Sequence, residues 1–160
     1  MDGAANTGRT LDGLSASVLA LMRALDHNRN RVATKFNLTC SELRAVARVA
    51  EAGSITPKVL AESLEMTTGA VTAISNRLVA LELLARVAHP HDRRSLLLVL
   101  TPAAEEITQT IYGDFQALIT HAARDVSQDD QVRLGELLSS VAVVVRSDDL
   151  SLAGPATYIP

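Results

Sequence analysis

The chain has 160 residues, of which 48% are apolar, and a formal net charge of −3. This length corresponds to about one domain and leaves no room for a separate catalytic domain. No segment approaches the roughly 18 uninterrupted apolar residues of a membrane span, and the N-terminal stretch lacks an apolar signal core. We therefore expect a cytoplasmic protein that is not an enzyme and has no membrane partner.

Two helices are predicted in the N-terminal part of the chain. Apolar residues recur at helical spacing over residues 10–35, which indicates one long helix. Thr39 is followed three residues later by Glu42, which is the spacing of a capping box. The apolar pattern that begins there stops at Gly53, so we expect a second helix between these points.

A third and a fourth helix follow closely. Thr56 and Pro57 combine a capping side chain with a first-turn proline, and Thr67 or Thr68 then caps the next helix. In this fourth helix one stripe is apolar and consists of Val71, Ile74, Leu78 and Leu81. The side chains predicted to point away from the stripe are Thr68, Thr72, Ser75, Asn76 and Arg77.

The polar face of the fourth helix suits the major groove of DNA. Small hydroxyl and amide side chains can approach base edges and phosphates closely, and Arg77 can contact guanine in a bidentate manner or hold a phosphate. A solvated helix surface is the alternative interpretation of the same residues. Ser54, Thr56 and Lys58, near the start of the third helix, could hold a phosphate, but capping alone accounts for Thr56.

A β-hairpin is predicted after the fourth helix. Residues 84–88 and 96–100 favour strands, and the polar sequence HPHDRR at 89–94 separates them. Two strands joined by a basic tip form a wing, although an ordinary polar turn would have a similar composition. Arg86 is expected to brace its strand or to meet a backbone phosphate rather than to read a base.

Two long helices are predicted at the C-terminal end. Thr101 with Pro102 and Ser127 with Asp130 provide their start signals. Both helices carry more apolar surface than one compact domain can bury, and exposed apolar patches usually mark interfaces. We therefore infer a homodimer built from the first helix and the last two.

The order of these elements and the sequence of the wing resemble the MarR (multiple antibiotic resistance regulator) family of winged helix-turn-helix transcription factors. That family has a wing pattern like D-P-x-D-R-R followed by a strand ending in L-T-P, and this chain has HPHDRR at 89–94 and LTP at 100–102. FNLTCSELRAVARVAEAG and ITPKVLAESLEMTTGAVT extend the resemblance upstream, so that it spans roughly residues 11–146. Two positions depart from the pattern: His89 replaces the first Asp, and Glu82 replaces a usual turn Gly.

The resemblance implies a mainly α fold with a small β-wing in a single domain, residues 1–160. Its winged helix-turn-helix lobe would be residues 39–101, its dimerisation helices residues 10–35 and 102–146, and its tail residues 147–160. In the family the wing Asp pairs with the Arg two residues later, here Asp92 and Arg94, and so prepares that Arg for a minor groove. The DNA contacts expected in this chain are Thr67, Thr68, Gly69, Thr72, Ser75, Asn76, Arg77, His91, Asp92, Arg93 and Arg94.

The net charge does not oppose this expectation, because residues 67–101 contain four Arg and two acidic residues, which gives +2. The implied partners are double-stranded DNA, a second copy of the chain and a small aromatic or phenolic effector. The implied activity is that of a repressor that a ligand releases from a near-palindromic operator.

Other interpretations remain open at this stage. Cys40 is the single cysteine and could make the chain a redox-sensing regulator, although a packed, inert thiol is the simpler interpretation. The acidic pI of about 5.8 is consistent with a dimeric interaction module that has lost DNA binding. His89, His91 and Asp92 are metal-ligand types, but Pro90 between the histidines favours plain wing residues. No cofactor motif is present.

Overall fold

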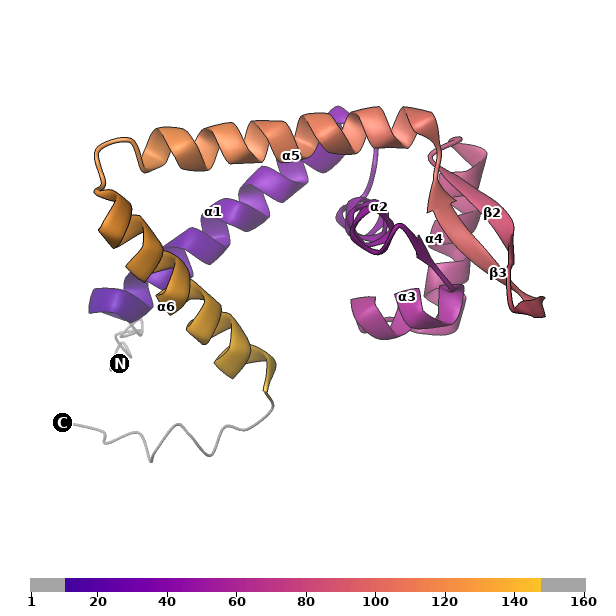
Figure 1. Ribbon diagram of the computed structural model, residues 1–160, viewed down its shortest axis with the longest axis horizontal. Helices are drawn as coiled ribbons and strands as arrows, with labels where there is room; N and C mark the ends of the chain where they lie inside the picture. The colour runs from indigo at the N-terminus through magenta and orange to yellow at the C-terminus, as the bar shows by residue number, and fades with distance from the viewer. Residues whose placement is uncertain (1–10, 148–160) are drawn as a thin grey trace, which may run out of the picture. The chain divides into compact units, whose positions relative to one another are not determined.

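The computed structural model describes residues 11–147, apart from the side chain of Arg93. The predicted tail, residues 147–160, therefore lies almost entirely outside the described residues. The helices are α1 (Gly13–Lys35), α2 (Cys40–Ala52), α3 (Pro57–Leu64), α4 (Thr68–Ala80), α5 (Pro102–Ala122) and α6 (Gln128–Arg146). The strands are β1 (Ser54–Ile55), β2 (Leu84–His89) and β3 (Asp92–Leu100) (Figure 1). The fold is mainly helical with one small antiparallel sheet, as predicted.

The helices begin where the capping residues predict. Thr39 and Glu42 form a complete capping box at α2. The Thr56 hydroxyl accepts a hydrogen bond from the Val59 N–H at α3, at 3.3 Å, and Ser127 caps α6 in the same way. These contacts satisfy backbone N–H groups that the first turn of a helix leaves without a helical partner. Only α1 differs, because it begins at residue 13 and not at residue 10.

The sheet has the order β1-β3-β2, with β3 in the centre. The two predicted strands of the wing are confirmed, but β3 begins four residues earlier than predicted, at Asp92. A register shift follows Ala88, and the turn at the tip shortens to Pro90 and His91. The strand β1 was not predicted. It pairs Ile55 with Leu98 and attaches the start of α3 to the sheet.

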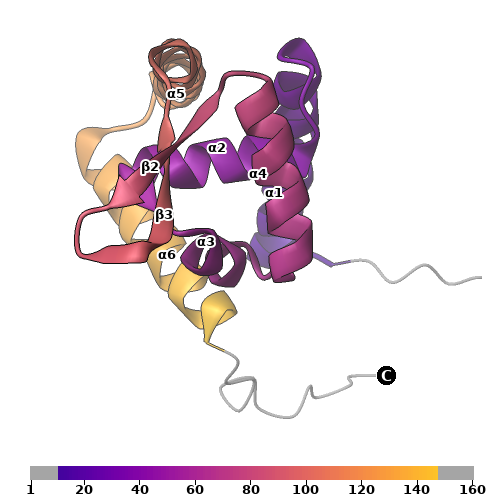
Figure 2. The same ribbon diagram turned by 90° about the vertical axis from the view of Figure 1, so that its right-hand side faces the viewer.

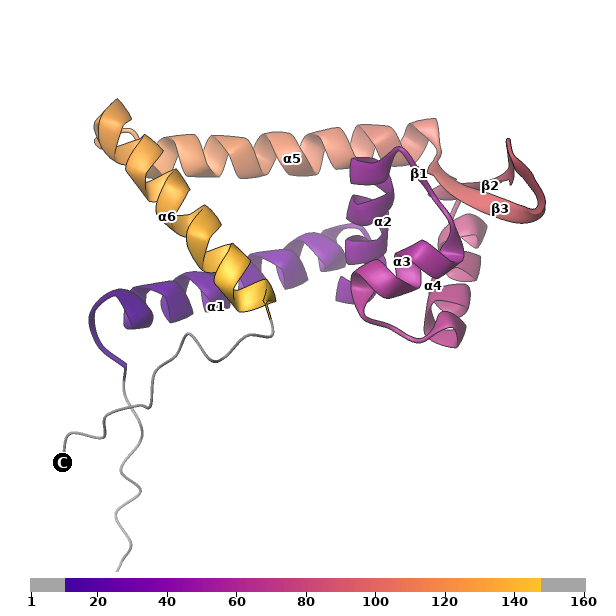
Figure 3. The same ribbon diagram turned by 60° about the horizontal axis from the view of Figure 1, so that its bottom comes forward.

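The lobe that contains the wing is held together by one core. The helices α2, α3 and α4 pack against one another, and the sheet packs against α2 and α4 (Figures 2 and 3). Each of these elements contributes a side chain that is almost completely buried: Val46, Leu60, Leu78 and Leu98. The first turns of α5 join this core through Ala104, which is buried, and Ile107, which is half-buried. Burial of such side chains stabilises the packing of α4 against the rest of the lobe.

The turn between α4 and the wing has an unfavourable backbone conformation at Glu82. Its φ of 57° lies in the left-handed region, which costs a non-glycine residue roughly 1–2 kcal/mol. The Glu82 carbonyl accepts a hydrogen bond from the Thr101 hydroxyl at 2.6 Å, which ties the root of the wing to the start of α5. Leu81, predicted to belong to the apolar stripe of α4, is 40% exposed because the helix ends at Ala80.

The chain divides into two compact units within α5, between Tyr112 and Gly113. In the second unit, the helix α6 has no buried residue. Its exposed apolar side chains are Val132, Leu134, Leu137, Leu138, Val143, Val144 and Val145. In the first unit, the N-terminal half of α1 also exposes apolar side chains, namely Leu14, Leu21 and Met22. Within residues 11–147, no helix is long and apolar enough to span a membrane.

Candidate nucleic-acid interface

The helix α4 presents one polar face to solvent. Thr68, Thr72 and Asn76 are exposed and follow one another at intervals of four residues, so they lie along one side of the helix. Gly69 is also exposed, and no atom would lie within 4 Å of a Cβ added there. Thr67 caps the helix, since its hydroxyl accepts a hydrogen bond from the Ala70 N–H at 3.2 Å. Small side chains thus occupy the exposed part of the first two turns.

The predicted orientation of Ser75 is wrong. Its side chain is buried, with 1% of the residue exposed, on the face of α4 that also buries Val71 and Leu78. Its hydroxyl oxygen has no hydrogen-bond partner within the described part of the chain. A buried polar group without a partner costs free energy and cannot reach a nucleic acid. We therefore remove Ser75 from the candidate interface.

Arg77 is bound to another helix of the lobe. Its guanidinium donates a hydrogen bond to Glu42 of α2 and a second one, at 3.4 Å, to the Asn37 carbonyl. Glu42 is buried, whereas the Arg77 side chain remains 45% exposed. The structure thus gives Arg77 a role within the protein that the sequence analysis missed. A contact between Arg77 and DNA stays a prediction, but it would compete with this ion pair.

Glu42 is the carboxylate on which this contact depends. The same Oε2 atom that pairs with Arg77 also accepts the Thr39 N–H of the capping box, at 2.7 Å. Burial by itself raises the pKa of the Glu42 carboxyl. The hydrogen bonds from Arg77 and Thr39, together with the charge of Arg77, outweigh burial and leave the pKa below its ordinary value. Glu42 is therefore charged at neutral pH.

Asn76 is bound on the other side of α4. Its side-chain oxygen accepts a hydrogen bond from the guanidinium of Arg86 on β2. This contact supports the expectation that Arg86 braces its strand, and it joins α4 to the wing. Two neighbouring residues of α4, Asn76 and Arg77, thus attach the helix to the wing on one side and to α2 on the other.

The wing tip consists of the turn at Pro90 and His91 and of the first residues of β3. The Asp92 carboxylate accepts a hydrogen bond from the Arg94 main-chain N–H at 2.9 Å. The observed contact between these two residues therefore uses the backbone, whereas the expectation was a pair of side chains. His89 and His91 lie in an edge-on ring contact at 6.3 Å, and Arg94 is exposed. The side chain of Arg93, another expected contact, lies outside the described residues.

Cys40 and the histidines of the wing have ordinary surroundings. The Cys40 thiol is half-buried at the first position of α2 and donates a hydrogen bond to the Asn30 side chain at 2.6 Å. This places Cys40 where α1 meets α2. Among the described residues, no group of three His, Cys, Asp or Glu side chains could hold a metal ion.

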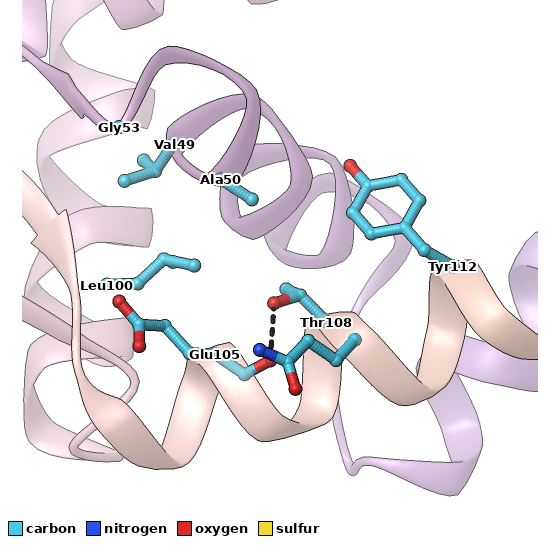
Figure 4. Close-up of a pocket in the computed structure, with 8 residues that line it drawn as sticks. Val49, Ala50, Gly53, Leu100, Glu105, Thr108 and Tyr112 are labelled. Atoms are coloured by element: carbon cyan, nitrogen blue, oxygen red, sulfur yellow. Dashed lines mark hydrogen bonds between the residues drawn. The ribbon is translucent and has the colours of Figure 1, made fainter.

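One pocket, of about 270 Å³, lies where α2, the end of β3 and the start of α5 meet (Figure 4). Val49, Ala50 and Leu100 supply apolar surface, and Glu105 supplies a carboxylate. Tyr112 extends from α5 with its ring directed toward α2. Burial, and then the negative charge of Glu51, raise the pKa of the Tyr112 hydroxyl. None of the residues that line this pocket is Lys, Arg or His.

We expect Ser75→Ala to raise the free energy of unfolding by about 1 kcal/mol, because the substitution removes a buried hydroxyl that has no partner. The substitution should leave binding to a DNA duplex unchanged. Ser63→Ala is the matched control, since this residue is exposed and its hydroxyl donates a hydrogen bond to the Leu60 carbonyl. Urea denaturation and DNA titration test both statements. A destabilised Ser75→Ala protein, or one with reduced DNA affinity, would contradict the structural assignment.

We expect Glu42→Gln to lower the free energy of unfolding at pH 7 by about 1–3 kcal/mol, because the ionic contact with Arg77 is lost. A lowered pKa in the folded state contributes stability above the unfolded value, near 4.5, and loses it as pH falls through the folded value. The gap between wild type and Glu42→Gln should therefore close in acid.

Denaturation at a series of pH values measures this gap, and groups that titrate in both proteins cancel in the difference. Glu51→Gln is the control, because the Glu51–Arg48 pair is exposed and should contribute little. A gap that stays constant from pH 7 to pH 3 would show that Glu42 does not act through its charge.

Comparison with known proteins agrees with this geometry. Residues 38–96 match the model of the MarR family. The multiple antibiotic resistance protein MarR of Salmonella typhimurium strain LT2 is 26% identical over 117 residues, which are 72% of this chain and 81% of that protein. The HTH-type transcriptional repressor MdtR of Bacillus subtilis strain 168 is 21% identical over 139 residues, covering 87% and 90% of the two chains.

Solved structures have the same fold. The ligand-free structure of wild-type MarR from E. coli superimposes with a TM-score of 0.63 at 23% identity and covers 82% of this chain and 98% of its own. NadR in complex with 4-hydroxyphenylacetate gives a TM-score of 0.63 at 20% identity, with coverages of 86% and 98%. Residues 38–96 thus match the MarR family of transcription regulators, and the order of helices and wing is that of the solved structures of this family named above.

Proposed function

We propose that the protein is a homodimeric repressor that binds a near-palindromic operator in the cytoplasm and is released by a small effector. The observation that supports this most is the exposed face of α4, which carries Thr68, Thr72 and Asn76 beside a wing that exposes Arg94. An α-helix with small polar side chains fits the major groove, and an Arg on a wing tip fits the adjacent minor groove.

The electrostatics of the lobe support DNA as the partner. The chain as a whole is acidic, but residues 67–101 carry four Arg and two acidic residues. One of these Arg, Arg77, neutralises the buried Glu42, so four Arg face three acidic residues and an excess of one positive charge remains. The field near the proposed interface is therefore more positive than the net charge indicates, and local field determines binding to phosphates.

The exposed apolar residues of α1 and α6 support a homodimer. A helix that buries none of its apolar residues in its own chain needs a partner surface. Leu134, Leu137 and Leu138 recur at helical spacing, as in helices that pack against a neighbour. A second copy of the chain would cover them and would place two copies of α4 on two half-sites.

We expect Arg94→Ala to weaken DNA binding and to reduce the slope of log affinity against log salt by about one. The reason is that one cationic side chain no longer enters the negative potential of the minor groove. Fluorescence anisotropy with duplexes selected from a random library measures affinity and slope. Sedimentation velocity of the same proteins without DNA should give twice the mass of one chain.

Arg48→Ala is the matched control, since this Arg lies on α2, outside the proposed DNA contacts and dimer helices, and pairs with Glu51 at the surface. Its affinity and salt slope should equal those of the wild type. Failure of the wild-type protein to select any duplex would refute DNA binding and favour a dimeric interaction module. A monomer in the centrifuge would refute the dimer.

The pocket between α2, β3 and α5 is the candidate effector site. NadR, which has the same fold, was solved with 4-hydroxyphenylacetate, so phenolic acids are the first class to test. Val49, Ala50 and Leu100 suit an aromatic ring, but the Glu105 carboxylate repels an anion. A phenolic acid should therefore bind weakly to the wild-type protein.

We expect Glu105→Gln to bind 4-hydroxyphenylacetate several-fold more tightly than wild type. The substitution removes the repulsion between the Glu105 carboxylate and the carboxylate of the ligand, which is about 1 kcal/mol. Isothermal titration calorimetry measures the affinities, and the bound compound should weaken DNA binding. Glu106→Gln, a neighbour outside the lining residues, is the control. Equal affinities for all three proteins would exclude this pocket as the site of phenolic acids.

A further inference from the structure

The contact between Asn76 and Arg86 determines which atoms Asn76 can offer to a base. Guanidinium groups only donate hydrogen bonds, so the Asn76 atom that faces Arg86 must be the oxygen Oδ1. The amide nitrogen Nδ2 then lies on the other branch of the side chain. No hydrogen bond of Nδ2 is found within residues 11–147, and both of its N–H groups are available.

The strand β2 explains why Arg86 reaches this oxygen. Side chains alternate along a strand, so Arg86 shares one face of the sheet with Leu84. Leu84 is buried, and β2 packs against α4 on this face. Arg86 is paired with Leu98 of β3, which fixes its backbone in the centre of the wing. Its side chain therefore extends toward α4 from a rigid base.

A free Asn side chain reads adenine best, because its oxygen accepts from the adenine N6 amino group while its nitrogen donates to N7. Arg86 takes one of the two acceptor positions of Oδ1 and fixes the plane of the Asn76 amide, which disfavours the bidentate contact with adenine and leaves both N–H groups of Nδ2 to donate. In the major groove, guanine offers the acceptors O6 and N7, and thymine offers O4. The occupied oxygen thus changes the base that suits Asn76.

We infer that Arg86 is a specificity-determining residue: by holding Oδ1 of Asn76, it directs this side chain to guanine or thymine and away from adenine. The inference rests on the proposed DNA binding, and it concerns the base that α4 selects. Arg86 acts as a positioning residue, because it works through Asn76. Its charge also adds to general DNA affinity, but only the link to Asn76 can change a base preference.

The test is selection from a random duplex library with the wild type and three variants. Asn76→Ala identifies the base pair that Asn76 reads, because preference is lost there alone. At this position the wild type should prefer guanine or thymine. Arg86→Ala frees the oxygen and should raise the preference for adenine relative to guanine and thymine on the order of tenfold. The other positions should keep their preferences.

Asn76→Asp separates the contact with Arg86 from the contact with the base. A carboxylate can still accept the hydrogen bond from Arg86, so the link to the wing persists, but it has no N–H to donate. The preference for guanine or thymine should disappear while the fold is retained. Arg86→Lys keeps the positive charge and a donor, and should resemble the wild type more than Arg86→Ala does. Circular dichroism verifies that each variant is folded.

Several outcomes would overturn the inference. One is an unchanged preference at the Asn76 position in Arg86→Ala. Others are a wild-type preference for adenine, and an Asn76→Ala protein whose preferences equal those of the wild type at every position. These outcomes differ from failure of the proposed function, in which the wild-type protein selects no duplex at all.

Discussion

The buried carboxylate of Glu42 is the contact on which the geometry of the lobe depends. One oxygen closes the capping box of α2 and receives the guanidinium of Arg77 from α4. Burial of a carboxylate costs free energy unless its charge and its hydrogen-bonding capacity are satisfied. Removal of one partner leaves a buried charge that no other contact compensates. The start of α2 and the orientation of α4 are therefore coupled, because a movement of either helix would break a hydrogen bond to the Glu42 carboxylate.

The helix α4 has three kinds of position. Val71, Ser75 and Leu78 face the core, Asn76 and Arg77 attach the helix to its neighbours, and the small residues of the first two turns remain exposed. The longest polar side chains of α4 are thus already engaged within the protein. The carboxylate that contacts α4 directly, Glu42, is neutralised inside the lobe, which would favour the proposed approach of this helix to DNA.

The sequence predicts those features that depend on neighbouring residues. The capping residues Thr39, Thr56 and Ser127 are identified because a cap and its N–H group lie within three residues. Ser75 is missed because its polarity predicts exposure, although its position four residues after Val71 and three before Leu78 places it on the apolar stripe. The link from Arg77 to Glu42 is missed because it spans 35 positions. The strand β1 is missed because two residues carry no periodicity, and only pairing with β3 defines it. Long-range contacts thus decide which polar side chains of α4 remain available.

Attachment of α4 on both sides limits how an effector could act. Arg77 fixes α4 to α2, and Asn76 fixes it to the wing, so α4 does not rotate independently of the lobe. A rotation would break an ionic or a charge-assisted hydrogen bond. The pocket at Val49 and Ala50 lies on the C-terminal half of α2, whose N-terminal end holds Glu42. An occupant of that pocket therefore acts on the helix that orients α4. In the proposed dimer, a response to an effector would move the lobe as one body and change the separation of the two α4 helices, because the orientation of α4 within its lobe is fixed.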